Sequence, residues 1–230
     1  MSNSKDKNNI PGSICAVIPF YNEKATLNKV LLETTKYVHY IFAVNDGSND
    51  DTYDYERKNT KVKFIDLENN FGKGRALDVG FKAAVSSGYD SVVTLDADLQ
   101  HDAKYIPALV EGLKLFDIVI GNRLKNLKCM PLQRKISNKL TSFFLTLKTG
   151  QEILDSQCGF RAYSAKVLSV VNTNYPGFEA ESEILVKAAK KEFKIGFVEI
   201  PTIYGNENSK MRPVRAIFGF LKVILKRFEG

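Results

Sequence analysis

Two acidic residues, Asp96 and Asp98, follow the apolar run 92–95 and stand two positions apart. Alternate residues of an extended strand point to the same face, so both carboxylates can approach one cation, with Gln100 in line if the chain stays extended. Carboxylate and amide oxygens suit Mg²⁺ or Mn²⁺, which usually complete their shell with water and substrate phosphates. The spacing therefore predicts a divalent-cation site that binds a diphosphate.

Three further polar segments also follow apolar runs: PFYNE (19–23), NDGS (45–48) and FGKGRA (71–76). Ligands of open parallel sheets bind beyond the carboxyl ends of the strands, so we expect these segments to meet at one edge. In the third, the glycines and a helix start with Lys73 and Arg75 favour an anion. The alternative for each segment is an ordinary turn or helix cap. Neither a P-loop nor a dinucleotide-binding G-x-G-x-x-G is present, which argues against those two nucleotide-binding classes.

Short β-branched runs at residues 14–18, 41–45, 62–67, 91–95 and 118–121 predict strands. Helical spacing of apolar residues lies between them, first at Leu27, Val30, Leu31, Thr34 and Val38, then at Ala76, Phe81, Ala84 and Val85. This alternation predicts an α/β fold with a mostly parallel central sheet and helices on both faces. After Arg123 the alternation stops, and residues 124–149 and 181–191 are predicted to be helical.

Composition narrows the class of protein. The chain has 230 residues, of which 44% are hydrophobic, and a formal net charge of +7, values that fit a folded domain and exclude disorder as its main state. Three cysteines without C-x-x-C spacing argue against a disulfide framework and a thiolate zinc site, and two histidines exclude a three-histidine metal site. Residues 1–12 are polar and lack a signal-peptide core, so we expect a disordered leader.

Six motifs follow one another along most of the chain. They are PFYNE (19–23), NDGSNDDT (45–52), GKGRA (72–76), DADLQH (96–101), GNR (121–123) and DSQCGFR (155–161). In this series the chain resembles the family 2 glycosyltransferases of GT-A fold, and among them the dolichol-phosphate mannose synthase-like branch, whose acceptors are polyprenyl phosphates. Where that family often has a second Asp, this chain has Asn45, which leaves one carboxylate fewer near the nucleotide.

The resemblance implies a set of site residues. Those expected to bind the nucleotide sugar are Pro19, Tyr21, Glu23, Val44, Asp46, Lys73, Asp96, Ala97 and Asp98. Asp96, Asp98 and Gln100 would hold Mg²⁺ or Mn²⁺, which stabilises charge growing on the leaving nucleoside diphosphate. Catalysis is expected to involve Asp98, Arg123 and Lys210, the last from a Ser209–Lys210 pair on a mobile loop. We expect inversion at the anomeric carbon of a hexose, mannose or glucose, carried by GDP or UDP.

The acceptor decides which groups the second half must supply. A lipid monophosphate needs cations, preferably arginines, and Arg123, Arg134 and Arg161 are the candidates. The alternative for these arginines is a surface position or a pairing with Asp155 or Glu179. A saccharide hydroxyl acceptor would instead need a carboxylate base, for which the candidates are Glu179, Glu181 and Glu183. Their helical spacing prevents all three from facing one site.

The last segment, residues 213–230, has apolar residues on one helical face and Arg215, Lys222 and Lys226 on the other. It predicts either a helix in the membrane interface or one that packs on the domain; the net charge and a lipid substrate favour the membrane. We expect a single catalytic domain over 13–212, with a donor half to 123 and an acceptor half from 124. The expected location is cytoplasmic, peripheral on the cytoplasmic face of the membrane.

A function from another class is a basic, non-catalytic module that binds nucleic acid or membrane surfaces. Such modules need clustered Lys and Arg, usually with interleaved aromatic residues, whereas the informative residues here are acidic and follow strands. The sequence therefore favours an enzyme whose partners are a nucleotide sugar and a polyprenyl phosphate, without nucleic acid.

Overall fold

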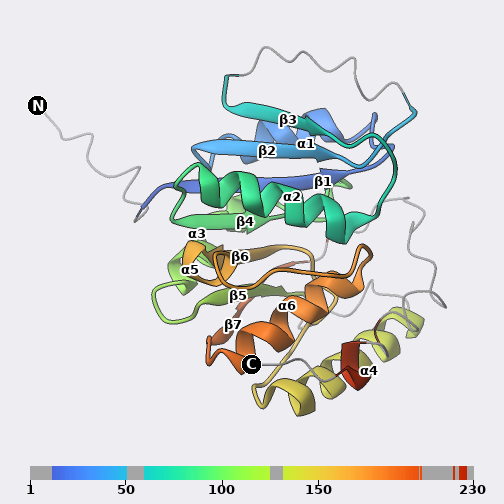
Figure 1. The fold of residues 1–230 in the computed structure, drawn as a ribbon, viewed down its shortest axis with the longest axis vertical. Helices are drawn as coiled ribbons and strands as arrows, with labels where there is room; N and C mark the ends of the chain where they lie inside the picture. Colours follow the sequence, from blue (N-terminus) through green and yellow to red (C-terminus); the bar gives the residue numbers. More distant parts are fainter. Residues whose placement is uncertain are drawn as a thin grey trace, which may run out of the picture.

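A computed structural model of the chain describes residues 12–50, 60–124, 132–201, 203, 220 and 223–226. Its strands form one sheet in the order β3-β2-β1-β4-β6-β5-β7 (Figure 1). The strands are β1 (Ile14–Phe20), β2 (Tyr40–Asn45), β3 (Val62–Asp66), β4 (Ser91–Thr94), β5 (Ile118–Asn122), β6 (Arg161–Ser164) and β7 (Ile195–Glu199). Neighbouring strands run parallel except at β6, which is antiparallel to both β4 and β5.

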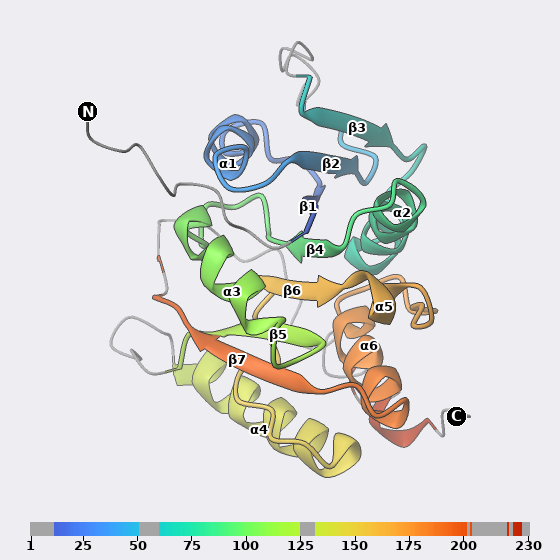
Figure 2. The same cartoon turned by 90° about the vertical axis from the view of Figure 1, so that its left-hand side faces the viewer.

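Helices cover both faces of the sheet (Figure 2). One face carries α1 (Leu27–Thr34), the 3-10 turn η2 (Ala103–Tyr105) and α3 (Ile106–Gly112). The other carries α2 (Lys73–Ser86), α5 (Ala165–Leu168) and α6 (Glu179–Lys190). The helix α4 (Leu132–Thr149) lies beyond β7 and packs against α6.

The core lies between the sheet and these helices. All seven residues of β1 are buried, as expected for a strand covered on both sides. Side chains such as Ile14 and Ile18 are fully buried, and each contributes roughly 1.5–3 kcal/mol of transfer free energy. Gly80 lets α2 lie close to β1, because a Cβ there would stand 2.3 Å from a methyl carbon of Val17. Larger side chains at Gly80 would force helix and sheet apart.

The predicted α/β fold with a mostly parallel sheet is confirmed, as are the five predicted strands, within two residues at each end. The strand β6 was not predicted, because it is short and begins with a charged residue. The strand β7 was not predicted either. Helix α4 begins at Leu132, within the predicted 124–149, and α6 covers Glu179–Lys190, where 181–191 was predicted. Val38 is buried but lies beyond the end of α1. None of the described helices is both long and apolar enough to cross a bilayer.

Candidate active site

The loops after β1 and β2 are joined by hydrogen bonds at the carboxyl edge of the sheet. Asn22 adopts a left-handed conformation with φ 53°, which Asn tolerates better than most residues. Its backbone N–H donates to Ser48 Oγ at 3.0 Å, and its side-chain oxygen accepts from the N–H of Asn49 at 2.9 Å. The PFYNE and NDGS segments therefore meet, as the sequence predicted.

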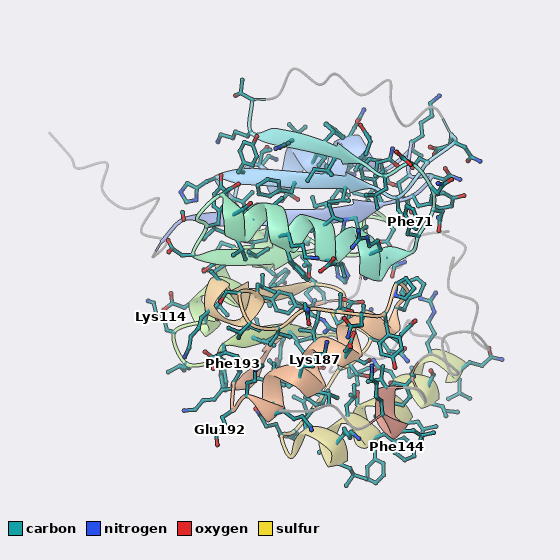
Figure 3. All side chains as sticks on the ribbon, in the orientation of Figure 1. Phe71, Lys114, Phe144, Lys187, Glu192 and Phe193 are labelled. Atoms are coloured by element: carbon teal, nitrogen blue, oxygen red, sulfur yellow. The ribbon has the colours of Figure 1, made fainter. Side chains whose placement is uncertain are left out.

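Asp46 joins a third loop to this edge. Its carboxylate accepts from the backbone N–H groups of Phe71 and Gly72, at 2.9 and 2.8 Å. Burial raises the pKa of Asp46, and these two hydrogen bonds offset part of that rise. Figure 3 shows Phe71 at the edge where the parallel strands end. Asp46 thus fixes the loop that leads into α2.

Asn45, the departure from the family pattern, has a local explanation. Its side-chain amide donates to Asp66 Oδ1 at 3.3 Å, while its oxygen accepts from the N–H of Ser48 at 2.9 Å. An Asp at this buried position would place a second carboxylate against Asp66. The amide therefore suits this turn better than a carboxylate does.

The N-terminus of α2 does not form the predicted anion cradle. The N–H groups of Gly74 and Arg75 donate to the carbonyl oxygen of Pro176, at 2.7 and 3.3 Å. A Cβ on Gly72 would stand 2.5 Å from that same oxygen, so this glycine is required by the approach of the chain's own loop. Because the loop already accepts these hydrogen bonds, the backbone N–H groups of the helix start are not open to an anion, and the binding of the nucleotide sugar by Lys73 stays a prediction.

Lys73 forms the centre of a charged cluster. Its Nζ lies 2.6 Å from Asp96 Oδ1 and 3.1 Å from Glu181 Oε2. Burial alone would lower the pKa of Lys73, but the two carboxylates raise it well above its ordinary value. For the Asp96 carboxyl, burial acts in the opposite direction and would raise the pKa, but Lys73 and the nearby His101 hold it well below its usual range. Both groups are therefore charged at neutral pH.

Gly159, from the DSQCGFR motif, lies directly against this cluster. A Cβ at this position would stand 2.6 Å from Asp96 Oδ2 and 2.8 Å from Lys73 Nζ. The carbonyl oxygen of Gly159 accepts from Thr94 Oγ1 at 2.9 Å, which fixes the loop beside the end of β4. The glycine is thus needed for close approach of the loop to the acidic motif.

The acidic motif itself turns, which corrects the extended geometry expected from the sequence. Strand β4 ends at Thr94, and Leu99 adopts a left-handed φ of 62° that costs roughly 1–2 kcal/mol for a residue with a Cβ. Asp98 Oδ1 accepts from the backbone N–H of Gln100 at 3.1 Å. Gln100 therefore does not continue a straight line of ligands beyond Asp98.

The chemistry of these donors still fits a hard divalent cation. Asp96 keeps 30% of its side-chain surface exposed, and carboxylate oxygens are the ligands that Mg²⁺ and Mn²⁺ prefer. Within the described residues, no group of three or more His, Cys, Asp and Glu side chains could hold a metal. A cation at Asp96 and Asp98 would therefore take further ligands from substrate phosphates and water.

Arg123 forms a two-pronged ion pair at the end of β5. Its Nε and Nη2 donate to the two oxygens of Asp155 at 2.8 and 2.9 Å. Asn138 of α4 adds a bond of 2.6 Å to Asp155 Oδ1. Burial would raise the pKa of Asp155, but Arg123 lowers it below its ordinary value. This Arg123 cluster, consisting of Arg123, Asp155 and Asn138, ties β5 to α4.

Arg161 does not lie where a phosphate could reach it. Its side chain is fully buried on β6, and its guanidinium donates to three carbonyl oxygens of the chain. These belong to Ser156, Cys158 and Glu181, at distances of 2.8, 2.7 and 3.2 Å. The phosphate-binding role expected for Arg161 is therefore corrected to a structural one, with three backbone oxygens and the Glu181 carboxylate as partners.

The other predicted residues divide into three groups. Pro19, Val44 and Ala97 are buried, and the Val44 side chain faces Gly80 of α2, so their nucleotide-binding roles stay predictions. Tyr21, Glu23 and Arg134 are partly exposed. Ser209 and Lys210 lie outside the described residues, as does most of the predicted helix 213–230.

The three candidate bases have different surroundings. Glu183 is fully buried and accepts from Thr173 Oγ1 and from the N–H of Asn174, each at 2.7 Å. Glu181 lies beside Lys73 and 3.6 Å from the guanidinium of Arg161. Glu179 is partly exposed in the first turn of α6. As their spacing predicted, they do not face one site.

The part of the chain that forms this edge of the sheet matches a known protein family. The profile of the Glycosyl transferase family 2 matches residues 15–171, a stretch that contains the acidic motif and the Arg123 cluster. The chain belongs to this family. It is a glycosyltransferase, as its motifs predicted.

Several of its relatives are named as transferases that act on dolichyl phosphate or undecaprenyl phosphate. The chain is 36% identical to the UDP-N-acetylglucosamine–dolichyl-phosphate N-acetylglucosaminyltransferase of Methanococcus voltae, over 90% of this chain and 92% of that protein. It is 32% identical to the dolichol-phosphate mannosyltransferase of Pyrococcus furiosus, over 94% of this chain and 64% of that protein. The predicted resemblance to the polyprenyl-phosphate branch is confirmed.

Among solved structures, glucosyl-3-phosphoglycerate synthase from Mycobacterium tuberculosis, in complex with UDP, matches with a TM-score of 0.71. The match covers 97% of this chain and 87% of that one at 20% identity. At this identity the likeness shows the fold alone. The predicted GT-A type fold is confirmed.

Sequence reasoning missed several residues that organise the site. Asn138 carried no motif signal, and the carbonyl oxygen of Pro176 is a backbone atom that no side-chain pattern reveals. Gly159 belongs to the DSQCGFR motif, in which the sequence predicted a role only for Arg161. The sign available in the sequence was a glycine between two apolar residues, Cys158 and Phe160, where a side chain would otherwise be expected.

Proposed function

We propose that this glycosyltransferase transfers a hexose from a nucleotide sugar to a polyprenyl phosphate, with a divalent cation and with inversion at the anomeric carbon. The observation that carries the proposal is the carboxyl edge of the sheet, where the acidic motif meets the loops after β1, β2 and β3. Support for the acceptor comes from relatives whose names include dolichyl-phosphate and undecaprenyl-phosphate transferases.

The residues of this edge would divide the work. Tyr21, Glu23 and Asp46 would contact the nucleotide, and Lys73 would hold Asp96 in place through their ion pair. Asp96 and Asp98 would hold Mg²⁺ or Mn²⁺, the cations named with solved structures of the same fold. Such an ion lowers the cost of charge growing on the leaving diphosphate. Lys210 stays a prediction for the same task.

A phosphate acceptor fits the acceptor half better than a hydroxyl does. A phosphate oxygen is already anionic and needs cations, which Arg123 and Arg134 would supply. A hydroxyl would need a carboxylate base, but Glu183 is buried and Glu181 lies beside two cations. Glu179 is the remaining candidate for the hydroxyl alternative.

The test is release of nucleoside diphosphate by the purified chain with Mn²⁺. GDP-mannose, UDP-glucose and UDP-N-acetylglucosamine are each offered with and without a short polyprenyl phosphate; the third donor is suggested by the Methanococcus voltae relative. We expect release with one donor only, dependent on both the lipid phosphate and the cation. Release with a saccharide acceptor in place of the lipid phosphate would shift the proposal to the hydroxyl alternative.

A further inference from the structure

The outer face of α4 carries large apolar side chains that are more than half exposed. They are Leu132, Ile136, Leu140, Phe143 and Leu147, with exposed fractions of 70, 59, 55, 57 and 66%. Residues spaced by three or four positions share one side of a helix, so these five form a continuous row, here called the α4 stripe. A contiguous apolar row of this kind on a protein surface marks an interaction site.

The inner face of α4, which packs on the domain, is formed by residues other than those of the stripe. Its buried residues are Asn138, Ser142 and Leu145, two of which are polar. Asn138 binds Asp155, and Ser142 Oγ lies 3.1 Å from Ser156 Oγ. A surface helix ordinarily turns its apolar side inward and its polar side to water. On α4 the large apolar side chains of the stripe face outward, while the buried side holds Leu145 together with two polar residues.

Charge indicates what covers the stripe. Helix α4 contains Arg134, Lys135, Lys139 and Lys148 and no acidic residue. Apolar side chains flanked only by cations suit an anionic lipid surface, where the side chains enter the acyl boundary and the cations approach the headgroups. Pairing of two such helices from two copies would bring the cations together with no carboxylate from either helix. Charge therefore favours the bilayer over a second copy.

The apolar surface includes a neighbouring segment. Lys148 Nζ donates to the backbone oxygens of Ile224 and Lys226, at 2.8 and 3.1 Å. Between them, Leu225 is 79% exposed. Figure 1 shows this segment, in dark red, beside α4. A further apolar side chain is thus available next to the stripe.

We propose that α4 is the surface through which this protein docks on an anionic lipid bilayer. The helix begins on the side of the molecule where the parallel strands end (Figure 1), and its Asn138 holds the Asp155 that pairs with Arg123. Docking by α4 would place the Arg123 cluster beside the bilayer. The stripe stands on its own observations, and this link to a lipid-phosphate acceptor rests on the proposed function.

The test is co-flotation of the full chain with vesicles of phosphatidylcholine, with or without about one quarter phosphatidylglycerol. The stripe variant combines Leu140→Gln with Phe143→Gln. Its matched control combines Leu32→Gln with Leu115→Gln, which are 57 and 74% exposed and lie on other elements. We expect roughly tenfold weaker binding for the stripe variant, since two apolar side chains no longer enter the bilayer, and no change for the control.

A charge variant tests the second part of the argument. Lys135→Gln with Lys139→Gln is expected to weaken binding to the anionic vesicles by roughly tenfold, and the weakening should shrink at high salt. Its control, Lys29→Gln with Lys63→Gln, removes the same charge from exposed positions elsewhere and should change binding much less.

Two results would overturn the proposal. One is equal flotation of the stripe variant and the native chain. The other is a dimer in sedimentation experiments that the stripe variant abolishes, which would assign the stripe to a second copy. Transfer to a short polyprenyl phosphate in detergent separates this proposal from the proposed function. Native binding to vesicles with no transfer to any polyprenyl phosphate would leave the docking surface standing and reject the acceptor.

Discussion

Asp96, at the carboxyl edge of the parallel strands, keeps 30% of its side-chain surface exposed, whereas Asp155 and Arg161 are fully buried in the interior around β6. Both regions pair carboxylates with cations. At the edge, the loops leave acidic oxygens within reach of a ligand. In the interior, the chain's own carbonyl, carboxylate and amide groups satisfy the charges.

This difference separates two uses of the same residue types. A buried charge costs free energy unless it is paired and hydrogen-bonded, so the interior charges fix the loop 155–161 in one conformation. That loop brings Gly159 against Asp96, so the interior shapes the edge. Substitutions in the interior should therefore change stability, and substitutions at the edge should change turnover.

The largest effect is expected for Arg161→Met. This change leaves three carbonyl oxygens without their buried donor and removes one of the two cations beside Glu181, and the free energy of unfolding should fall by about 4 kcal/mol. Urea denaturation followed by circular dichroism measures the loss. Arg75→Met is the control, because Arg75 is 52% exposed and its solvent-screened pair with Asp78 should matter little. Equal small losses in both variants would contradict the structural role of Arg161.

Asp98→Asn tests the edge. Loss of one carboxylate from the proposed cation site should lower the rate of nucleoside-diphosphate release by about a hundredfold and leave the melting temperature unchanged. Steady-state release assays and thermal denaturation on one preparation check both expectations. Asp102→Asn, a nearby carboxylate paired with Lys104, is the control. Native turnover in the Asp98 variant would remove this residue from the reaction.

Asp155→Asn tests how the unfolding free energy depends on pH through a buried carboxylate. Since Arg123 holds the pKa of Asp155 below its ordinary value, the charged form stabilises the fold above about pH 4, and this stabilisation is lost as pH falls through the lower native pKa. The variant should lose about 2 kcal/mol of unfolding free energy at pH 7 and differ less from the native chain in acid. Urea denaturation across pH measures this. A difference that stays constant with pH would contradict the assignment.

Gly159→Ala acts where the two regions meet. The added Cβ would displace Asp96 and Lys73, so turnover should fall by roughly tenfold, with about 1–2 kcal/mol lost from stability. Gly112→Ala crowds Val119 at 3.0 Å instead and should lower stability without lowering turnover. The ratio of the two turnover rates, measured on folded protein, separates approach to the acidic motif from crowding in general.

Asn45→Asp should have the smallest effect. A carboxylate there would face Asp66 in place of the present 3.3 Å hydrogen bond, at a cost of about 1 kcal/mol at pH 7 because Asp66 lies in an exposed position. Near pH 4 the cost should shrink as the introduced carboxyl takes up a proton. Melting temperatures at the two pH values test this sign. A more stable variant at pH 7 would show that Asn45 is not fitted to this turn.

The sequence predicted the parallel half of the sheet because its strands are apolar runs separated by amphipathic helices. It also predicted that the PFYNE and NDGS segments meet, since parallel strands end at the same edge. The antiparallel strand β6 was missed, because four residues that begin with a charged Arg161 give no alternating or apolar signal. The turn at Leu99 was also missed, because leucine rarely adopts a left-handed conformation and its presence therefore does not indicate such a turn.

Local pattern alone determined the fold class, the family and the acidic motif, because these depend on periodicity and on the order of short motifs. Tertiary structure decided what each charged residue does. Arg123 and Arg161 are the same residue type in neighbouring motifs, yet one keeps 12% of its side chain exposed beside Asp155 and the other is fully enclosed by backbone oxygens. The reason is physical: a charge takes its role from the groups packed around it, and those groups come from segments far apart in the chain.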